Sequence, residues 1–279
     1  MKIEEAITLF GYHQRSNQKT RTIQSYRPLL EKLETRFAGR SFDSIGPDEI
    51  YHFLEAITEN QANSTRCLRF AQCKAFYNFL IEKADLDMGN PCDAPILTKA
   101  FKAPKQVARR ILDRETVEEL IYNAENMRNR LILELQARCG LRIGESLKIT
   151  VKDVSDRKLI LQEPKSGKES EVAFMPEQIA KRLHDYIQQE NLSSEDRLFP
   201  ICYSTARAAI RRIGKRLNVS LTPHDLRRYS ATHASRNGIP LEIVSKVILR
   251  HQDLKTTQAY LGKISDMEAI RWMGILHGR

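Results

Sequence analysis

Residues 222–238 read TPHDLRRYSATHASRNG, a stretch bounded by a proline and a glycine. Pro223 suits the first turn of a helix, where no backbone N–H is needed, and Gly238 is typical of the position just past a helix end. The stretch therefore predicts a helix. Its first turn carries His224 and Arg227, which share a face because they are three residues apart. That face is either solvated or part of a site.

The charge of the chain is unevenly distributed. The 279 residues carry a formal net charge of +10. Residues 1–103 hold 14 Lys and Arg against 13 Asp and Glu, so nearly all of the excess positive charge lies in residues 104–279. A basic second half favours a polyanionic partner such as a nucleic acid over a small apolar ligand. A well-solvated basic surface would explain the same numbers.

The sequence shows no pattern typical of a metal site, a cofactor site or a membrane-spanning segment. Five cysteines are scattered without a C-x-x-C pair, and no carboxylate cluster of the kind that holds two magnesium ions is evident. The N-terminus, MKIEEAITLF, lacks the basic start of a signal peptide, and no apolar run approaches the ~18 residues of a membrane span. We therefore expect no metal, no cofactor and no membrane association, and a cytoplasmic protein.

The first hundred residues show the periodicity of helices separated by short loops. Apolar residues recur at helical spacing in TRTIQSYRPLLEKLETRFAG, GPDEIYHFLEAI and NSTRCLRFAQCKAFYNFLIEK. This pattern predicts a small all-helical domain over residues 1–98. A basic linker over 99–110 should follow, because it contains five cations and no acid. The five cations are Lys99, Lys102, Lys105, Arg109 and Arg110. We expect them to contact a phosphate backbone, although a linker that is merely soluble would have the same composition.

Residues 111–279 predict a second domain, mainly helical with one small β element. Asp113 is a candidate N-cap, and Gly140 is a natural helix stop. The stretch RKLILQEPKSGKESEVAFMP predicts a β-hairpin with a lysine-bearing tip, and SDMEAIRWMGIL predicts a tail helix over 265–276. The fold class expected is thus mainly α with a small β-hairpin, in two domains.

Four short stretches of the second domain hold unusual polar residues. They are CGLRIGES with Arg142 and Glu145, the hairpin tip with two lysines, the helix with His224 and Arg227, and LRHQDLKTTQAYLG with His251 and Tyr260. Taken singly, each has a simple structural explanation, such as an exposed ion pair or a core tyrosine. Together, two arginines, a lysine and two histidines can clamp a phosphate and handle protons around it, with a tyrosine as nucleophile.

In this order, the four stretches resemble the catalytic domain of the tyrosine recombinase (phage integrase) family, near its Xer-like members. The resemblance covers about residues 111–265 and implies a helical SAM-like core-binding domain before it. It is specific because H-x-x-R is followed by L-x-H and then, nine residues after that histidine, by a tyrosine. Two departures are Arg250, where the family usually has glycine, and Pro164 in the hairpin tip.

The resemblance implies a role for each matching residue. Arg142, Arg227 and His251 would donate hydrogen bonds to the non-bridging oxygens of the scissile phosphate. His224 would lie behind these residues, where it assists phosphate binding and proton transfer. Tyr260 would be the nucleophile, Lys165 the general acid for the departing 5′ oxygen, and Glu145 a carboxylate that supports the site's histidine. Lys168 would contact DNA and is the alternative to Lys165 as the acid.

The activity expected is site-specific recombination of double-stranded DNA through a 3′-phosphotyrosine, without metal or ATP. The resemblance also implies a homo-tetramer on paired sites, weakly associated or monomeric off DNA, and a nucleoid-associated location. A type IB topoisomerase-like relaxing enzyme shares this chemistry and is an alternative. A catalytically silent DNA-binding protein is a second alternative, but such a protein has no use for Tyr260 at its position.

DNA binding should weaken steeply with salt if the basic parts of the chain surround a duplex. Each neutralised phosphate contributes close to ~0.9 to the slope of log affinity against log salt concentration. A mobility-shift titration over a range of salt concentrations measures this slope. A nearly flat response would contradict a clamp around DNA.

Overall fold

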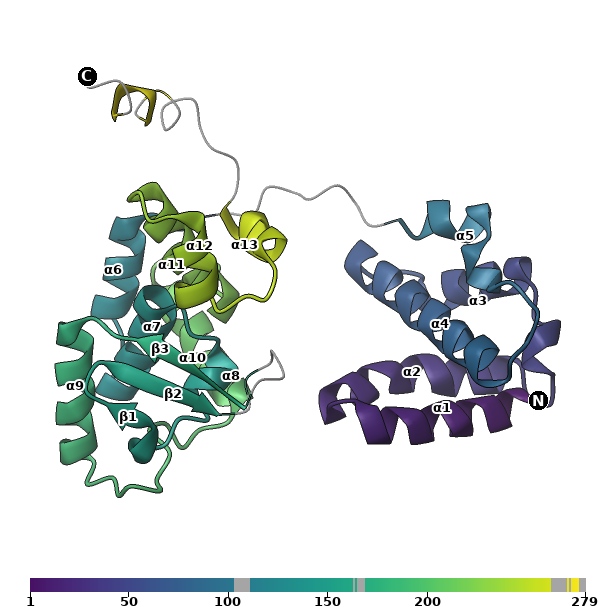
Figure 1. Cartoon of the computed structure of the whole chain (residues 1–279), viewed down its shortest axis with the longest axis horizontal. Coiled ribbons are helices and arrows are strands. Elements are labelled where there is room, and N and C mark those ends of the chain that lie inside the picture. Colours follow the sequence, from purple (N-terminus) through teal and green to yellow (C-terminus); the bar gives the residue numbers. More distant parts are fainter. Residues whose placement is uncertain (103–110, 163, 165–168, 262–269, 271, 276–279) are drawn as a thin grey trace. The chain divides into compact units, whose positions relative to one another are not determined.

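The computed structural model describes residues 1–102, 111–162, 164, 169–261, 270 and 272–275. The chain forms two compact units, Met1–Val107 and Ala108–Arg279, each with its own hydrophobic core (Figure 1). The expected division into two mainly helical domains is confirmed. No helix in these ranges is long and apolar enough to cross a membrane.

Apart from loops and one isolated β-bridge between Lys2 and Ser41, the described part of the first unit is helical. Its helices are α1 (Ile3–Asn17), α2 (Thr20–Arg36), α3 (Pro47–Thr58), α4 (Asn63–Lys83) and α5 (Pro95–Ala100), with short 3-10 turns at Phe42–Ser44 and Pro91–Asp93. Pro47 begins α3, as its position in the sequence predicts.

Aromatic rings fill the centre of the first unit. The ring of Phe10 on α1 lies 5.3 Å from those of Phe76 and Phe79 on α4, measured between centroids. A polar contact adds to this packing, because the side-chain amide of Gln72 donates to the Ser25 hydroxyl at 2.8 Å and so joins α4 to α2. The first unit is therefore held by α4 lying against α1 and α2.

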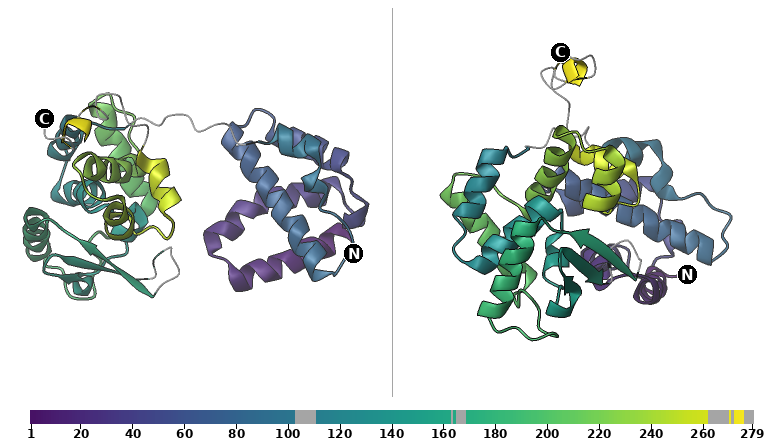
Figure 2. Two further views of the ribbon diagram at one scale, coloured as in Figure 1. Left: turned by 45° about the horizontal axis from the view of Figure 1, so that its top comes forward. Right: turned by 60° about the vertical axis from the view of Figure 1, so that its left-hand side comes forward.

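The second unit surrounds a small antiparallel sheet with helices. It contains α6 (Arg114–Tyr122), α7 (Met127–Cys139), α8 (Ile143–Ser146), β1 (Val154–Ser155), β2 (Lys158–Gln162), β3 (Ser170–Phe174), α9 (Glu177–Gln189), α10 (Tyr203–Arg216), α11 (Pro223–Arg236), α12 (Leu241–Ile243) and α13 (Leu254–Leu261), with short 3-10 and π-helical turns. The sheet lies below the group α11 to α13 in Figure 1 and in both views of Figure 2.

The sheet confirms the predicted pairing of two strands and adds a third. Strands β2 and β3 pair antiparallel with Leu159 opposite Ala173, and both side chains are buried in the core. The two-residue strand β1 pairs with β2 and was not expected, because so short a segment has no periodicity to detect. The predicted hairpin tip lies outside the described residues, except for Pro164.

Helix α11 forms the centre of the second unit and matches the stretch TPHDLRRYSATHASRNG. Every residue from Leu226 to Thr232 is buried, including two arginines. The helix packs against α7 on one side and α13 on another. Because residues 226–232 of α11 are covered, the polar side chains of this stretch face protein, whereas His224 in the first turn is exposed.

The chain changes direction sharply between α11 and α13. A single helix is expected for PLEIVSKVIL, but α12 passes after three residues into a π-helical turn over Val244–Ile248. Leu249 closes this turn by donating its backbone N–H to the carbonyl of Val244 at 2.9 Å. Such wide turns often occur at functional sites. Here the turn is followed directly by Arg250 and His251.

Gly140 allows α7 to end close to this π-helical turn. Its φ of +63° is left-handed, and a Cβ built on it would lie 2.6 Å from the carbonyl oxygen of Ile248. Only glycine avoids both the left-handed backbone cost and this contact. The close approach brings the end of α7 against the segment that carries His251.

Gly140→Ala should therefore destabilise the second unit strongly. The left-handed backbone alone costs an alanine about 1–2 kcal/mol, and the contact with Ile248 adds to it. Calorimetry should show a lower melting temperature for the transition of the second unit. Gly144→Ala is the matched control, because a Cβ there meets nothing within 4 Å. Equal effects of the two substitutions would contradict this explanation.

Candidate active site

The site begins at the turn between α7 and α8. Gly140 caps α7, and Arg142 is the N-cap residue of α8. The side chain of Glu145 accepts the backbone N–H of Arg142 at 2.8 Å, which is the N3 carboxylate half of a capping box. The local sequence thus fixes Glu145 directly beside Arg142 before any distant contact forms.

Arg142 and Glu145 also pair through their side chains. Arg142 Nη1 lies 2.5 Å from Glu145 Oε1. The Arg142 side chain is 26% exposed but that of Glu145 only 9%, so this is not the solvated surface pair that the spacing alone would suggest. A carboxylate this buried needs further partners to compensate for lost hydration.

Arg227 enters the site from α11 and is almost completely buried. Its Nη1 donates to the carbonyl of Gly140 and its Nη2 to the carbonyl of Leu249. These bonds join α11 to the end of α7 and to the segment before His251. Arg227 Nη1 also lies 3.9 Å from Glu145 Oε2, so both predicted arginines surround one carboxylate.

A third arginine, Arg250, completes the cluster. Its Nη2 lies 3.0 Å from Glu145 Oε2, and its Nε lies 3.8 Å from Glu171 Oε2 on β3. The cluster thus contains three guanidinium groups and two carboxylates. Burial alone would raise the pKa of Glu145, but the charges of Arg250 and Arg142, with the hydrogen bonds from Arg142, bring it below its ordinary value. Glu145 is therefore ionised at neutral pH.

His251 lies beside these arginines and is itself buried. Its Nδ1 lies 2.9 Å from the hydroxyl of Thr257, which donates to the hydroxyl of Ser245 at 2.9 Å. Because the Thr257 proton is used in this way, Nδ1 of His251 carries the hydrogen that Thr257 accepts. Burial, and then the positive charges of Arg227, Arg142 and Arg250, lower the pKa of His251 to about 4. The imidazole is thus neutral at pH 7, with Nε2 as its acceptor atom.

The other predicted site residues are placed only in part. His224 lies in the first turn of α11 with its side chain exposed. Tyr260 lies in α13, three residues after Thr257, but its side chain lies outside the described structure. Lys99 and Lys102 are exposed at the end of the first unit. The remaining predicted cations lie outside the described residues: Lys105, Arg109, Arg110, Lys165 and Lys168.

Sequence reasoning missed four residues that the structure places in or beside the cluster. Arg250 was noted only as a departure from the family's usual glycine, and Glu171, Thr257 and Ser245 were not singled out. A buried threonine or serine has no sequence signal of its own, because its partners come from other turns of the chain. For Arg250, the difference from the family's usual glycine was itself a sequence signal. A long cationic side chain at a position that usually holds glycine needs a charged or hydrogen-bonding partner.

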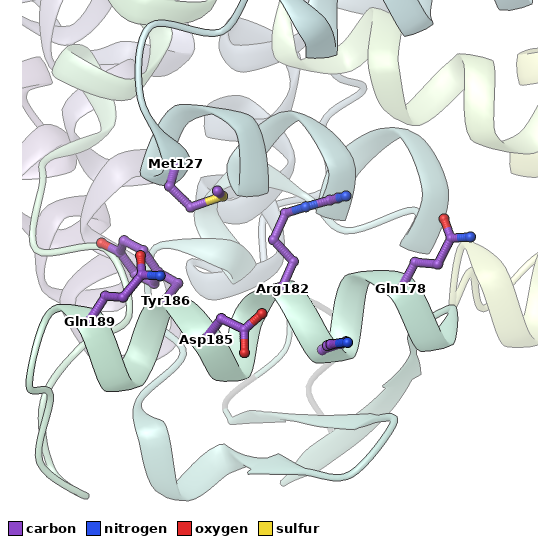
Figure 3. A pocket seen from close by; sticks show the side chains of 7 residues that line it. Met127, Gln178, Arg182, Asp185, Tyr186 and Gln189 are labelled. Atoms are coloured by element: carbon purple, nitrogen blue, oxygen red, sulfur yellow. The ribbon is translucent and has the colours of Figure 1, made fainter.

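A separate groove lies between the start of α7 and α9 (Figure 3). It has a volume of about 320 Å³ and is lined by residues such as Met127, Asp185 and Tyr186. Arg182 crosses it toward α7 (Figure 3). Its guanidinium pairs there with the buried Glu134. None of the predicted site residues lines this groove. Within the described parts of the chain, no group of three or more His, Cys, Asp or Glu side chains could hold a metal ion.

Comparison with known families identifies both units. Residues 110–265 match the phage integrase family, and residues 9–84 match the phage integrase N-terminal SAM-like domain. The chain therefore belongs to the phage integrase family of tyrosine recombinases, whose members carry out site-specific recombination.

Named relatives agree with this assignment. The chain is 31% identical to the tyrosine recombinase XerA of Saccharolobus solfataricus over 157 residues, which cover 56% of this chain and 53% of that one. The match thus spans about half the length of this relative. A tyrosine recombinase of Thermosipho africanus is 26% identical, with 96% of each chain covered.

Solved structures share the fold at lower identity. The Tn1549 transposon integrase in complex with transposon right end DNA is 16% identical with a TM-score of 0.78, covering 99% of this chain and 100% of that one. A lambda integrase tetramer bound to a Holliday junction is also 16% identical, with a TM-score of 0.74, covering 95% of this chain and 80% of that one.

The neutral state of His251 leads to a pH prediction. In the DNA-free protein its imidazole should titrate near pH 4, against about 6.5 in an unfolded chain. Below pH 6.5 the unfolded chain therefore binds a proton that folded His251 does not. Stability should fall as the pH decreases from about 6.5 to about 4, and His251→Asn should remove this part of the decrease.

Two measurements check this prediction. NMR of ring-labelled histidine gives the titration, with His251→Asn used to assign the resonance. Denaturant unfolding of both proteins between pH 7 and pH 4 gives the stability difference. An imidazole that titrates at or above pH 6.5 would show that the arginines do not act on His251 as described.

Proposed function

We propose that this protein is a site-specific DNA recombinase that cleaves and rejoins strands through a 3′-phosphotyrosine at Tyr260. The observation that carries the proposal is the meeting of Arg142, Arg227 and His251 around one ionised carboxylate. Helix α13, which contains Tyr260, begins three residues after His251. The hydrogen bond between His251 and Thr257 links this helix to the cluster.

Arg142 and Arg227 would bind the scissile phosphate. Attack on a phosphodiester increases the negative charge on its two non-bridging oxygens, and a guanidinium stabilises this charge with paired, fixed donors. The cluster has one more guanidinium than carboxylates, which favours an anion. Because its groups are buried and already oriented by protein contacts, they need little reorganisation during the reaction.

His251 would change its protonation state when DNA binds. In the free protein burial, and then three arginine charges, disfavour the imidazolium. A phosphate beside Nε2 brings negative charge, which favours the protonated form and raises the pKa. The imidazolium can then donate Nε2–H to a non-bridging oxygen, while Nδ1–H stays with Thr257.

The reaction breaks one phosphate ester bond and forms another, so it needs no external energy source. The Tyr260 oxygen loses its proton and attacks phosphorus, the bond between phosphorus and the 5′ oxygen breaks, and that oxygen takes up a proton. The products are a 3′-phosphotyrosine and a free 5′-hydroxyl. A 5′-hydroxyl of another strand can then reverse the step. The resemblance assigns the proton donor to Lys165, with Lys168 as the alternative, and further proton handling to His224.

The assembly proposed is a homo-tetramer on two paired duplex sites. Integrase neighbours are described as bound to DNA, and one as a tetramer on a Holliday junction. We propose that Lys99, Lys102 and the other cations of the basic linker contact the phosphate backbone, with the tail helix over 265–276 taking part in assembly. Ile270 and residues 272–275 are helical, and the side chains of Ile270 and Met273 are exposed.

Tyr260→Phe should abolish a covalent protein–DNA adduct while leaving DNA binding intact, because only the phenol oxygen is lost. The substrate is a duplex site selected from random DNA by binding to this protein, nicked next to each candidate scissile phosphate. Wild type should accumulate the adduct without added metal or ATP. Arg142→Ala should slow it on the order of 10²-fold, equivalent to about 3 kcal/mol of transition-state stabilisation.

Tyr203→Phe is the matched control, since Tyr203 is a partly exposed tyrosine at the start of α10 and should leave the adduct unchanged. Binding without an adduct in wild type would favour a silent DNA-binding protein. Relaxation of supercoiled DNA without strand exchange between two sites would favour the topoisomerase-like alternative. An adduct that persists in Tyr260→Phe would overturn the assignment of the nucleophile.

A further inference from the structure

Arg250 occupies a backbone conformation that normally suits glycine. Its φ is +53°, and among the described residues other than glycine with a left-handed φ, all others are Asn or Asp. Asn and Asp tolerate this conformation through local hydrogen bonds of their short polar side chains, which a long side chain such as arginine does not have. The side-chain contacts of Arg250 must therefore offset the backbone cost.

These contacts reach three separate segments of the second unit. Nη2 donates to the Gly140 carbonyl at 3.1 Å and to Glu145 at 3.0 Å, and Nη1 donates to the Ile248 carbonyl at 2.8 Å. Nε faces Glu171 on β3. The Arg250 side chain is only 4% exposed. It is thus placed to act on protein groups and not on solvent.

Arg250 shares its acceptors with the two predicted catalytic arginines. The Gly140 carbonyl accepts from both Arg227 and Arg250, and Glu145 pairs with both Arg142 and Arg250. If Arg250 is removed, Glu145 can shift toward Arg142 or Arg227 and change the orientation of either guanidinium. The position of both phosphate-binding groups therefore depends on Arg250.

The contact with β3 is close but incomplete. Arg250 Nε and Glu171 Oε2 are 3.8 Å apart, and both are buried atoms without a hydrogen-bond partner. Two complementary buried groups this close to each other gain a charge-assisted hydrogen bond if the gap closes by less than 1 Å. Strand β3 thus has a specific electrostatic attachment to the Arg142 and Glu145 turn through Arg250.

We infer that Arg250 is a positioning residue that holds Glu145, and through it Arg142, in place and attaches strand β3 to the active site. It does so without touching DNA. The expected effect of Arg250 on strand cleavage rests on the proposed function. Its expected effect on β3 and on the α7–α8 turn does not.

Two substitutions at Arg250 separate its charge from its bulk. Arg250→Met keeps most of the volume and loses the cation, and Arg250→Gly suits the backbone and leaves a cavity. Both should bind the selected DNA site like wild type but form the covalent adduct on the order of 10²-fold more slowly, as expected when catalytic groups are misplaced. Millimolar guanidinium ion should partly restore adduct formation by Arg250→Gly, because it can enter the cavity.

Matched controls test the alternative that the backbone alone matters. Asn218→Gly places glycine at another left-handed position, φ +54°, away from the site, and should cleave like wild type. Glu171→Gln should slow cleavage less than Arg250→Met, and the double variant should be no slower than Arg250→Met, since both changes break the same contact. Additive effects of the two would overturn the link to β3.

Hydrogen exchange provides a readout that is independent of recombination. In Arg250→Met, amides of both β3 and residues 140–147 should exchange faster than in wild type, whereas Asn218→Gly should leave them unchanged. Unchanged exchange in both segments would overturn the inference whether or not the protein cleaves DNA. Adduct formation within about threefold of wild type in Arg250→Met and Arg250→Gly would overturn it as well.

Discussion

A buried carboxylate, Glu145, makes it possible to hold three guanidinium groups within one small volume. Like charges this close together repel strongly in a medium of low polarity, and each has lost much of its hydration. Glu145 offsets part of this repulsion through direct contacts with Arg142 and Arg250 and a longer one with Arg227. The convergence of α8, α11 and the turn before α13 depends on this compensation.

The same compensation would let the cluster bind the phosphate that we propose and still fold. An excess of positive charge attracts a phosphate, but a larger excess would destabilise the second unit. With Glu171 included, two carboxylates face three guanidinium groups, so the remaining charge is small. His251 adds no further charge at neutral pH because its pKa is lowered to about 4. The protein thus limits its positive charge until an anion arrives.

Local sequence signals predicted much of this structure. Asp113 caps α6 as expected, accepting the N–H of Thr116 at 2.6 Å, and Gly140 ends α7. These features depend on neighbouring residues, which sequence patterns record directly. Resemblance to a family supplied Arg142, Arg227 and His251 as a set, and their proximity agrees with it. Arg250 could not be predicted in this way, because it contacts Gly140 across 110 residues of sequence and differs from the family pattern.

The segment from Val244 to Leu261 has a hydrophobic cluster of its own, and that cluster is small. It consists of Ala231, Val244 and Leu249, with Ile248 and Leu261 packed beside them, whereas the main core of the unit is far larger. Polar contacts from Arg227, Thr257 and Ser245 supply much of the remaining attachment. We therefore expect the segment to lie near the lower end of local stability and to open without unfolding of the whole unit. Because the arginine and histidine contacts of the site attach this segment, binding of the proposed phosphate and order in the helix that contains Tyr260 should be thermodynamically linked.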